Sequence, residues 1–191
     1  MRNEVSYYPE IQCFIEAQLK SNFRSGSSRE LHVFWGIGEL KTNLQRIISD
    51  HPVECACALD FSKRVPPLSL DIFAIVTDGR KFELLILEVK LVRSAGLSEW
   101  SQLVGYCLVS GAKYGLLLNI DNGGSPRLTQ MLQTEKHISH IRTTVNEETR
   151  EHILGFMQWN GLTQNFEYSN LGAIKSLSNL SERLVAEFIF E

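Results

Sequence analysis

The sequence predicts a mixed α/β protein, and three observations support this fold class. Residues 9–23 carry apolar side chains at helical spacing, and two strand-like runs, 68–76 and 82–90, are joined by turn residues. A further helix and an apolar strand follow that pair. The order helix, strand, strand, helix, strand is typical of a layered α/β arrangement.

The amino-acid composition excludes several classes of protein. The chain has 191 residues, of which 43% are hydrophobic and 21% are charged, so it can bury a core, which excludes disordered and fibrous proteins. With 19 Lys and Arg against 22 Asp and Glu, the net charge is −3. This excludes a surface that is basic throughout but allows a local basic cleft. We expect a cytoplasmic protein, because the sequence contains no apolar run of roughly 20 residues and starts without the pattern of a signal peptide.

The first part of the chain predicts alternating helices and strands. Pro9 begins a helix that ends before the run Ser25-Gly26-Ser27-Ser28. The patterns that follow predict a strand over 31–37, a helix over 40–48 and a strand over 53–61.

The middle of the chain predicts a hairpin, a helix and a buried strand. Asp78-Gly79-Arg80-Lys81 has the composition of a turn between the strands 68–76 and 82–90. Ser94 or Ser98 can cap a helix that runs to about Ser110 and ends at Gly111. A strand over 114–120 completes this part.

Beyond Gly124 the patterns are weaker. They indicate a short helix at 128–132, strand-like segments at 137–145 and 153–159, and a final helix over 176–190. We therefore expect one domain over 1–191, with a core at about 8–121 and a C-terminal extension at about 124–191.

The four cysteines do not indicate a metal or disulfide framework. Cys55 and Cys57 are one residue apart on an expected strand, and a zinc site would need a second pair of ligands with suitable spacing. We expect reduced thiols that pack as small apolar groups.

The hairpin brings two carboxylates and an amine together. If the turn is centred between Gly79 and Arg80, Asp71 lies opposite Glu88; if Asp78 and Gly79 form a two-residue turn, it lies opposite Ile86. Because side chains alternate with a period of two, Asp71, Glu88 and Lys90 share one face in either register.

Charged groups on such apolar strands need a partner, because burying an unpaired charge is costly. A divalent cation would remove the repulsion between Asp71 and Glu88, and oxygen ligands favour Mg²⁺ or Mn²⁺ over zinc. The structural alternative is a cross-strand salt bridge between these carboxylates and Lys90.

These residues resemble a known catalytic motif. Leu70-Asp71-Ile72-Phe73-Ala74-Ile75 followed by Leu87-Glu88-Val89-Lys90 is similar to the core of the PD-(D/E)XK nuclease superfamily. Gln102-Leu103-Val104-Gly105-Tyr106 resembles the Gln-x3-Tyr motif of its RecB-like branch. The resemblance covers about 8–121 and implies a restriction-endonuclease-like αβββαβ core, with a central mixed sheet flanked by helices. Leu70 stands where the family pattern has proline, which is a loose part of that pattern.

The resemblance also implies roles for individual residues. Asp71, Glu88 and the Val89 carbonyl would hold Mg²⁺ or Mn²⁺, and Lys90 would orient or deprotonate the attacking water. Gln102 and Tyr106, four residues apart on one helix face, would position Lys90 or the scissile phosphate. Many family members add a glutamate from the first helix; Glu10 and Glu16 are the candidates here, although a glutamate at such a position is more often a solvated helix charge.

The implied function is metal-dependent cleavage of DNA, by an endonuclease of restriction, phage defence or DNA repair. Most basic residues are expected to be solvated surface charges, but several would supply phosphate contacts if they line the cleft beside Asp71 and Glu88. They occur at Lys63-Arg64, Arg80-Lys81, 90–93 and Lys113, and later at Lys136, Arg142 and Arg150. The resemblance leaves two alternatives open: a non-cleaving module that binds DNA or protein, and a nuclease acting on RNA. We expect DNA as the partner, no membrane, and a homodimer or a place in a larger defence complex.

Overall fold

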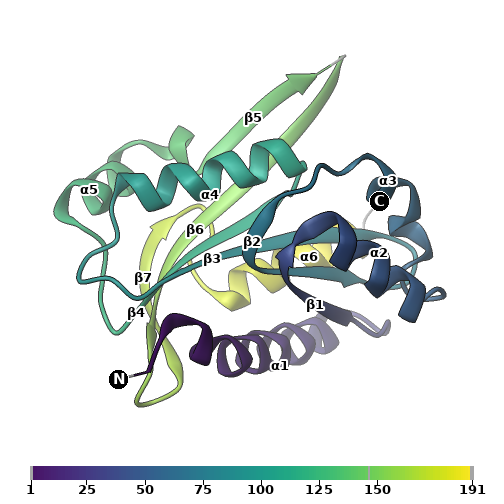
Figure 1. The fold of residues 1–191 in the computed structure, drawn as a ribbon, viewed down its shortest axis with the longest axis horizontal. Coiled ribbons are helices and arrows are strands. Elements are labelled where there is room, and N and C mark those ends of the chain that lie inside the picture. The colour runs from purple at the N-terminus through teal and green to yellow at the C-terminus, as the bar shows by residue number, and fades with distance from the viewer. Residues whose placement is uncertain (1, 146, 190–191) are drawn as a thin grey trace.

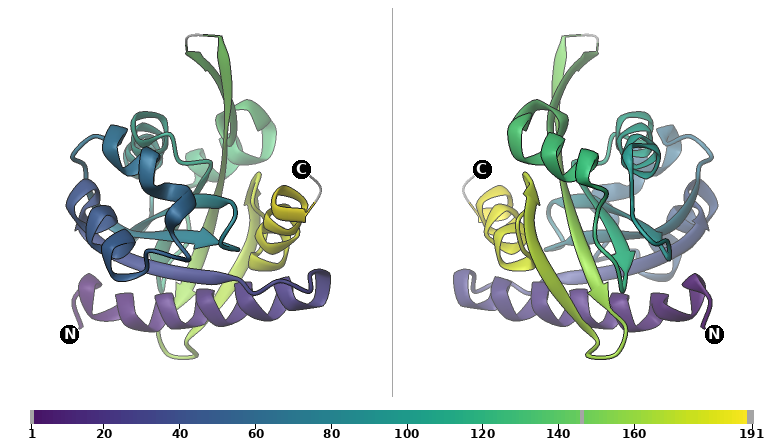
Figure 2. Two further views of the ribbon diagram at one scale, coloured as in Figure 1. Left: turned by 90° about the vertical axis from the view of Figure 1, so that its right-hand side faces the viewer. Right: turned by 90° about the vertical axis from the view of Figure 1, so that its left-hand side faces the viewer.

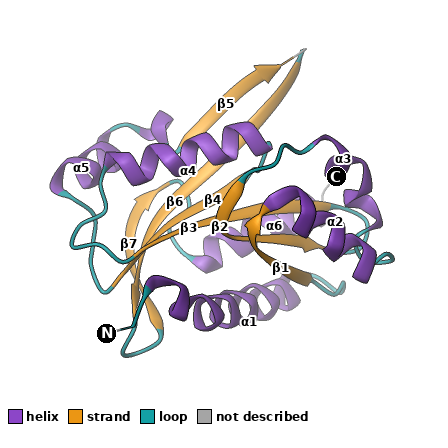
Figure 3. Ribbon diagram, in the orientation of Figure 1, coloured by secondary structure: helices purple, strands orange, loops and turns teal. Residues whose placement is uncertain are grey.

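The computed structural model describes residues 2–145 and 147–189, and in this part of the chain a seven-stranded mixed sheet has helices on both faces (Figures 1 and 3). The strand order is β1-β2-β3-β4-β6-β5, and β7 also pairs with β6. This arrangement confirms the predicted fold class of a mixed sheet flanked by helices. No helix in residues 2–145 or 147–189 has the length and apolarity to cross a membrane.

The N-terminal elements follow the predicted order. A short 3-10 helix, η1 (Glu4–Tyr7), leads into α1 (Tyr8–Gly26), and β1 (His32–Glu39) and α2 (Leu40–Asp50) follow. The apolar side chains of α1 recur every three or four residues and are buried; they are Tyr8, Ile11, Ile15, Leu19 and Phe23. This periodicity fixes the face that α1 turns toward the sheet.

The strand predicted over 53–61 is wrong. The segment instead forms a 3-10 turn, η2 (Ala56–Ala58), and a short helix, α3 (Leu59–Arg64). Cys55 and Ala58 are buried three residues apart, which is helical spacing, whereas Val53 is 79% exposed. Cys55 is buried and Cys57 is half-buried, so the two thiols do not share one strand face; all four cysteines are free.

The central hairpin consists of β2 (Ser69–Thr77) and β3 (Phe82–Lys90). Ile72 lies opposite Leu87 and Thr77 opposite Phe82, which is the register of a turn centred between Gly79 and Arg80. Of the two registers that the sequence allowed, the structure therefore shows the one that directs Asp71 toward Glu88.

A helix and a parallel strand extend the sheet beyond the hairpin. The helix α4 (Leu97–Ser110) begins after Gly96, not at Ser94 or Ser98, and Glu99 Oε2 accepts a hydrogen bond from the Gly96 N–H at 2.7 Å. Gly111 ends it with a φ of 77°, a left-handed conformation that glycine adopts without strain. The strand β4 (Tyr114–Ile120) pairs with β3 in parallel and is buried throughout.

The C-terminal part continues the same sheet. It contains α5 (Pro126–Thr134), η3 (Lys136–Ile138), β5 (His140–Val145), β6 (Glu148–Asn160), β7 (Asn165–Gly172) and α6 (Leu177–Ile189). Figure 2 shows the β5–β6 hairpin projecting beyond the body of the molecule. The strand β7 was not predicted, because its buried residues Phe166 and Leu171 are five positions apart, an odd separation that does not fit the period of two of a strand.

Two apolar cores lie on opposite faces of the sheet. One contains the buried sides of α1 and α6, and the other contains those of α2, α4 and α5 (Figure 2). On β3, Leu85, Leu87 and Val89 enter the first core, whereas Leu84 and Ile86 enter the second. Strand alternation therefore turns Glu88 toward the face covered by α2 and α4.

Candidate active site

Asp71, Glu88 and Lys90 lie together where β2 begins and β3 ends. The Lys90 Nζ forms an ion pair with Glu88 Oε1 and lies 3.5 Å from Asp71 Oδ2. The Glu88 side chain is only 1% exposed, whereas those of Asp71 and Lys90 are 25% and 19% exposed. The three predicted residues thus form one cluster that is buried at Glu88 and reaches solvent at the other two.

A local irregularity of β2 directs the Asp71 carboxylate. Gly36 of β1 pairs with Phe73 and Gly38 pairs with Leu70, so two residues of β2, Asp71 and Ile72, face a single residue of β1. Leu70 and Phe73 consequently pack in the same core, although simple alternation would separate them. Such a bulge reorients a side chain, and here it places a carboxylate at the end of the hairpin.

The Asp71 carboxylate replaces a backbone hydrogen bond where the pairing of β2 and β3 ends. The pairing of β2 with β3 ends at Ile72 and Leu87, and Asp71 Oδ2 then accepts a hydrogen bond from the Val89 N–H at 3.0 Å. The N–H and C=O of a strand residue point to the same side, so the Val89 carbonyl faces the same opening. The Val89 carbonyl is the backbone oxygen that the resemblance names as a metal ligand beside Asp71 and Glu88.

The cluster is electrostatically unbalanced. Burial raises the pKa of Glu88 to about 7 in the metal-free protein, because contact with Lys90 offsets only part of the cost and Asp71 adds repulsion. Glu88 Oε2 is buried and has no hydrogen-bond partner among the described residues. Burial opposes protonation of Lys90, but the nearby carboxylate of Glu88 outweighs it, so the pKa of Lys90 is raised.

A third carboxylate, Glu4, approaches the cluster from η1, and the sequence hypothesis missed it. Glu4 Oε2 accepts a hydrogen bond from the Leu91 N–H at 3.2 Å, and Glu4 Oε1 accepts one from the Tyr8 hydroxyl at 3.1 Å. Burial raises the pKa of Tyr8, as do the charges of Asp71 and Glu4. The sequence signal was present: Glu4 and Tyr8 are four residues apart, the spacing of neighbours on a helix.

The first-helix glutamates named from the sequence have other contacts. Glu10 pairs with Arg2 at 2.8 Å and lies two residues after the buried Tyr8, which places it about 200° around the helix. Glu16 pairs with Lys20 at 2.6 Å and accepts a hydrogen bond from Trp35 Nε1 at 3.0 Å. Glu4, not Glu10 or Glu16, is therefore the N-terminal carboxylate that the structure brings to this cluster.

Gln102 and Tyr106 lie on α4 and contact each other. Gln102 Nε2 donates a hydrogen bond to the Tyr106 hydroxyl at 2.8 Å. Gln102 is exposed and Tyr106 is half-buried against the second core. Neither side chain forms a hydrogen bond with Lys90 among the described residues, so the structure pairs these two residues but does not bring them to the carboxylates.

Asn119 supports the loop that follows Lys90. Its side chain is fully buried, accepts a hydrogen bond from the Val92 N–H at 3.2 Å and donates one to the Val92 carbonyl at 3.0 Å. It also donates to the Gly123 carbonyl at 3.0 Å. These bonds fix the backbone directly after β3 and therefore the end of the strand that carries Lys90.

The donor chemistry of the cluster fits a hard divalent cation. Glu4, Asp71 and Glu88 supply carboxylates, and Glu88 Oε2 is buried without a hydrogen-bond partner among the described residues. In the arrangement seen here, Lys90 occupies the position between Asp71 and Glu88. Among residues 2–145 and 147–189, no three His, Cys, Asp or Glu side chains are yet gathered as metal ligands. The cluster therefore has the type of oxygen donor that Mg²⁺ or Mn²⁺ prefers, but in this arrangement the Lys90 ammonium group lies beside both carboxylates.

Comparisons with known proteins add no family to this geometry. No protein-family model matches the chain, and neither the search of curated proteins nor the search of solved structures finds a match.

Proposed function

We propose that this protein is a metal-dependent nuclease that hydrolyses phosphodiester bonds of DNA, and that Asp71, Glu88 and Lys90 form its active site. The observation that supports the proposal most strongly is the buried carboxylate of Glu88, which has one oxygen without a hydrogen-bond partner among the described residues and lies beside Asp71. Burying a carboxylate with an unpaired oxygen lowers the stability of the fold, and a role in metal-dependent nuclease chemistry would explain why Glu88 is placed there.

Each residue of the cluster has a separate proposed role, which follows from its position. Asp71, Glu88 and the Val89 carbonyl would hold Mg²⁺ or Mn²⁺, which supplies positive charge and lowers the pKa of water. Lys90 supplies the cation of the site: its ammonium group orients the attacking water and offsets negative charge on the phosphate. Glu4 accepts from the backbone of Leu91 and holds the end of β3 in place. Gln102 and Tyr106 present donors on the same face of the sheet, where they contact the substrate strand.

A non-cleaving binding module of the same fold is the second candidate. The observation in its favour is the ion pair between Lys90 and Glu88, which neutralises one carboxylate without any metal. A purely structural salt bridge would look the same in this respect.

Incubation with supercoiled and linear DNA, in Mg²⁺, Mn²⁺, Ca²⁺ or excess EDTA, tests the proposal. We expect cleavage with Mg²⁺ and Mn²⁺, and binding without turnover with Ca²⁺, whose bonds to oxygen are longer and looser. Full activity in EDTA would contradict the metal site, and binding without cleavage under all conditions would favour the second candidate. A parallel incubation with RNA distinguishes the two nucleic acids as substrates.

A further inference from the structure

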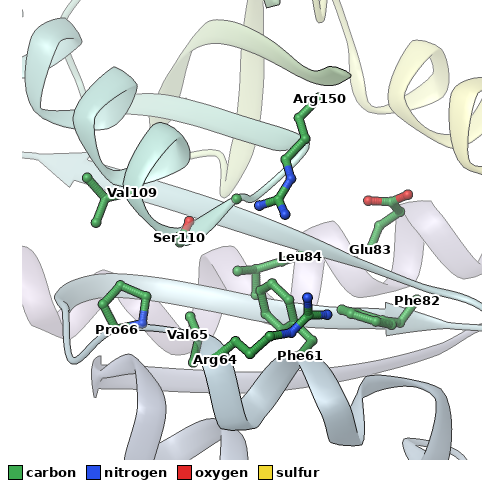
Figure 4. Close-up of a pocket in the computed structure, with 11 residues that line it drawn as sticks. Phe61, Arg64, Val65, Pro66, Phe82, Glu83, Leu84, Val109, Ser110 and Arg150 are labelled. Atoms are coloured by element: carbon green, nitrogen blue, oxygen red, sulfur yellow. The ribbon is translucent and has the colours of Figure 1, made fainter. Parts of the chain in front are cut away.

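A cavity of about 320 Å³ lies between α3, the end of α4 and β6 (Figure 4). Its walls are mixed in character: Phe61, Phe82 and Pro66 are apolar, whereas Arg64, Arg150 and Glu83 carry charges. In Figure 4 the guanidinium groups of Arg64 and Arg150 extend toward the cavity from opposite sides.

The two arginines have donors to spare. Arg64 donates from Nε to the Asp60 carbonyl at 3.4 Å, and its terminal nitrogens form no hydrogen bond or ion pair among the described residues. Arg150 donates from Nη2 to Glu148 at 3.3 Å, in a pair that is exposed on both sides. An exposed pair of this kind is worth little, so Arg150 is available to another anion.

The backbone at the end of α4 leaves room for Arg150. A Cβ atom at Gly111 would approach Arg150 Nη1 to 3.0 Å, so the absence of a side chain allows the guanidinium to lie there. The negative C-terminal end of the α4 helix dipole also stabilises a cation at this position. That structural role is the rival explanation for Arg150, and Arg64 has a comparable one, because it lies in the last turn of α3 and donates to the Asp60 carbonyl.

The cavity and the carboxylate cluster lie on the same face of β3. Leu84 lines the cavity and Glu88 belongs to the cluster, and residues four apart on a strand share a face with about 13 Å between them. Ile86, between these two residues, is buried in the second core, so a DNA strand that reaches both places passes over the covering helices and not along β3. Because consecutive phosphates of one strand advance about 3.4 Å along the helix axis, the cavity then lies at least about four nucleotides from a scissile phosphate at Glu88.

We infer that Arg64 and Arg150 form a phosphate-binding site for the DNA backbone, at a distance from the scissile bond. This inference rests on the proposed function, because it places the cavity along the path of the substrate. Two arginines against the single carboxylate of Glu83 give the cavity a net positive charge in a chain of net charge −3. Phosphate contacts of this kind position the nucleic acid without reading its sequence.

Duplex binding in EDTA, where cleavage is absent, tests the inference. We expect Arg64→Ala and Arg150→Ala each to reduce the slope of log affinity against log salt by about one unit, and the double variant by about two. Affinity of the double variant should fall about tenfold or more at low salt. Arg46→Ala is the matched control, because Arg46 is an exposed arginine of α2 that pairs with Asp50.

Two further measurements separate the possible failures. Titration with inorganic phosphate, followed by the NMR signals of the arginine Nε–H groups, should shift Arg64 and Arg150 but not Arg46. If the wild type cleaves DNA and the double variant keeps its affinity and salt slope, the inference is overturned and the nuclease assignment stands. If phosphate shifts both arginines while the protein neither binds nor cleaves DNA, the proposed function fails and the cavity serves a free phosphate compound. A melting temperature that falls in Arg150→Ala with an unchanged salt slope would assign Arg150 to the helix end alone.

Discussion

The ammonium group of Lys90 forms an ion pair with the carboxylate of Glu88, two residues earlier on the same strand. The pair is unequal, because the Glu88 side chain is almost completely buried and that of Lys90 is partly exposed. Glu88 is therefore the group of the pair whose ionised form depends on a cation nearby.

Lys90→Ala should destabilise the protein in EDTA and abolish cleavage. Removing the ammonium group leaves Glu88 buried without its partner, which costs about 3 kcal/mol in the free energy of unfolding where Glu88 is ionised and less where it takes up a proton. Loss of Lys90 should lower the rate of DNA cleavage by about 10²–10⁴-fold. Denaturant unfolding and a plasmid-nicking assay measure the two effects.

Two comparisons complete that experiment. Adding Mg²⁺ should restore much of the stability of Lys90→Ala, because the ion replaces the lost positive charge, and Glu88→Gln in the same background should also restore it. A Lys90→Ala protein that is destabilised equally with and without Mg²⁺, and still nicks DNA, would identify the cluster as a structural salt bridge.

Glu4→Gln should reduce cleavage, whereas Glu10→Gln should not. Glu4 accepts hydrogen bonds from Leu91 and Tyr8 beside the cluster, and Glu10 pairs with Arg2 away from it. Loss of an outer carboxylate of this kind typically lowers metal affinity or activity by about 10–100-fold. Initial rates at several Mg²⁺ concentrations compare the two variants. Equal rates in Glu4→Gln and the wild type would remove Glu4 from the site.

Tyr106→Phe should change activity more than stability. The substitution keeps the ring against the second core and removes the hydroxyl that accepts from Gln102. Because this contact is at the surface, we expect a change below about 0.5 kcal/mol in the free energy of unfolding, together with slower cleavage of DNA. Ser101→Ala, at an exposed position of the same helix, is the control. Unchanged cleavage by Tyr106→Phe would assign the Gln102–Tyr106 pair to the helix surface alone.

Asp78→Asn should destabilise the protein at neutral pH and lose this effect in acid. Burial opposes ionisation of Asp78, but hydrogen bonds from the backbone N–H groups of Lys81 and Arg80 and from Arg29 outweigh it, so its pKa is lowered. A carboxyl group with a lowered pKa contributes stability above its unfolded pKa of about 3.8 and loses it as the pH falls through the folded pKa.

We expect Asp78→Asn to lower the free energy of unfolding at neutral pH by about 1.5–3 kcal/mol, the contribution of a hydrogen bond to a charged group. The asparagine side chain keeps an acceptor for the turn but loses the negative charge opposite Arg29. Urea unfolding of both proteins between neutral pH and pH 3 measures it. The difference between them should shrink at the acid end; a difference that stays constant with pH would contradict the ionic contribution of Asp78.

The sequence by itself determined the elements whose signals are local. The apolar spacing of α1 fixed its buried face, Gly111 marked the end of α4, and the turn residues 78–81 located the hairpin. Alternation also kept Glu88 and Lys90 on one side of β3, because the period of a strand does not depend on what packs against it.

Only the tertiary structure decided the features that depend on distant partners. The bulge at Asp71 forms against Gly36 and Gly38 of β1, and Glu4 reaches Leu91 across 87 positions of the chain. The segment 53–61 buries Cys55 and Ala58 in the second core at helical spacing, so it forms a turn and the short helix α3. The periodicity of a segment shows which of its side chains share a face. The bulge, the position of Glu4 and the helix α3 depend instead on packing between elements far apart in sequence, and such packing leaves no periodic signal in the sequence of either element.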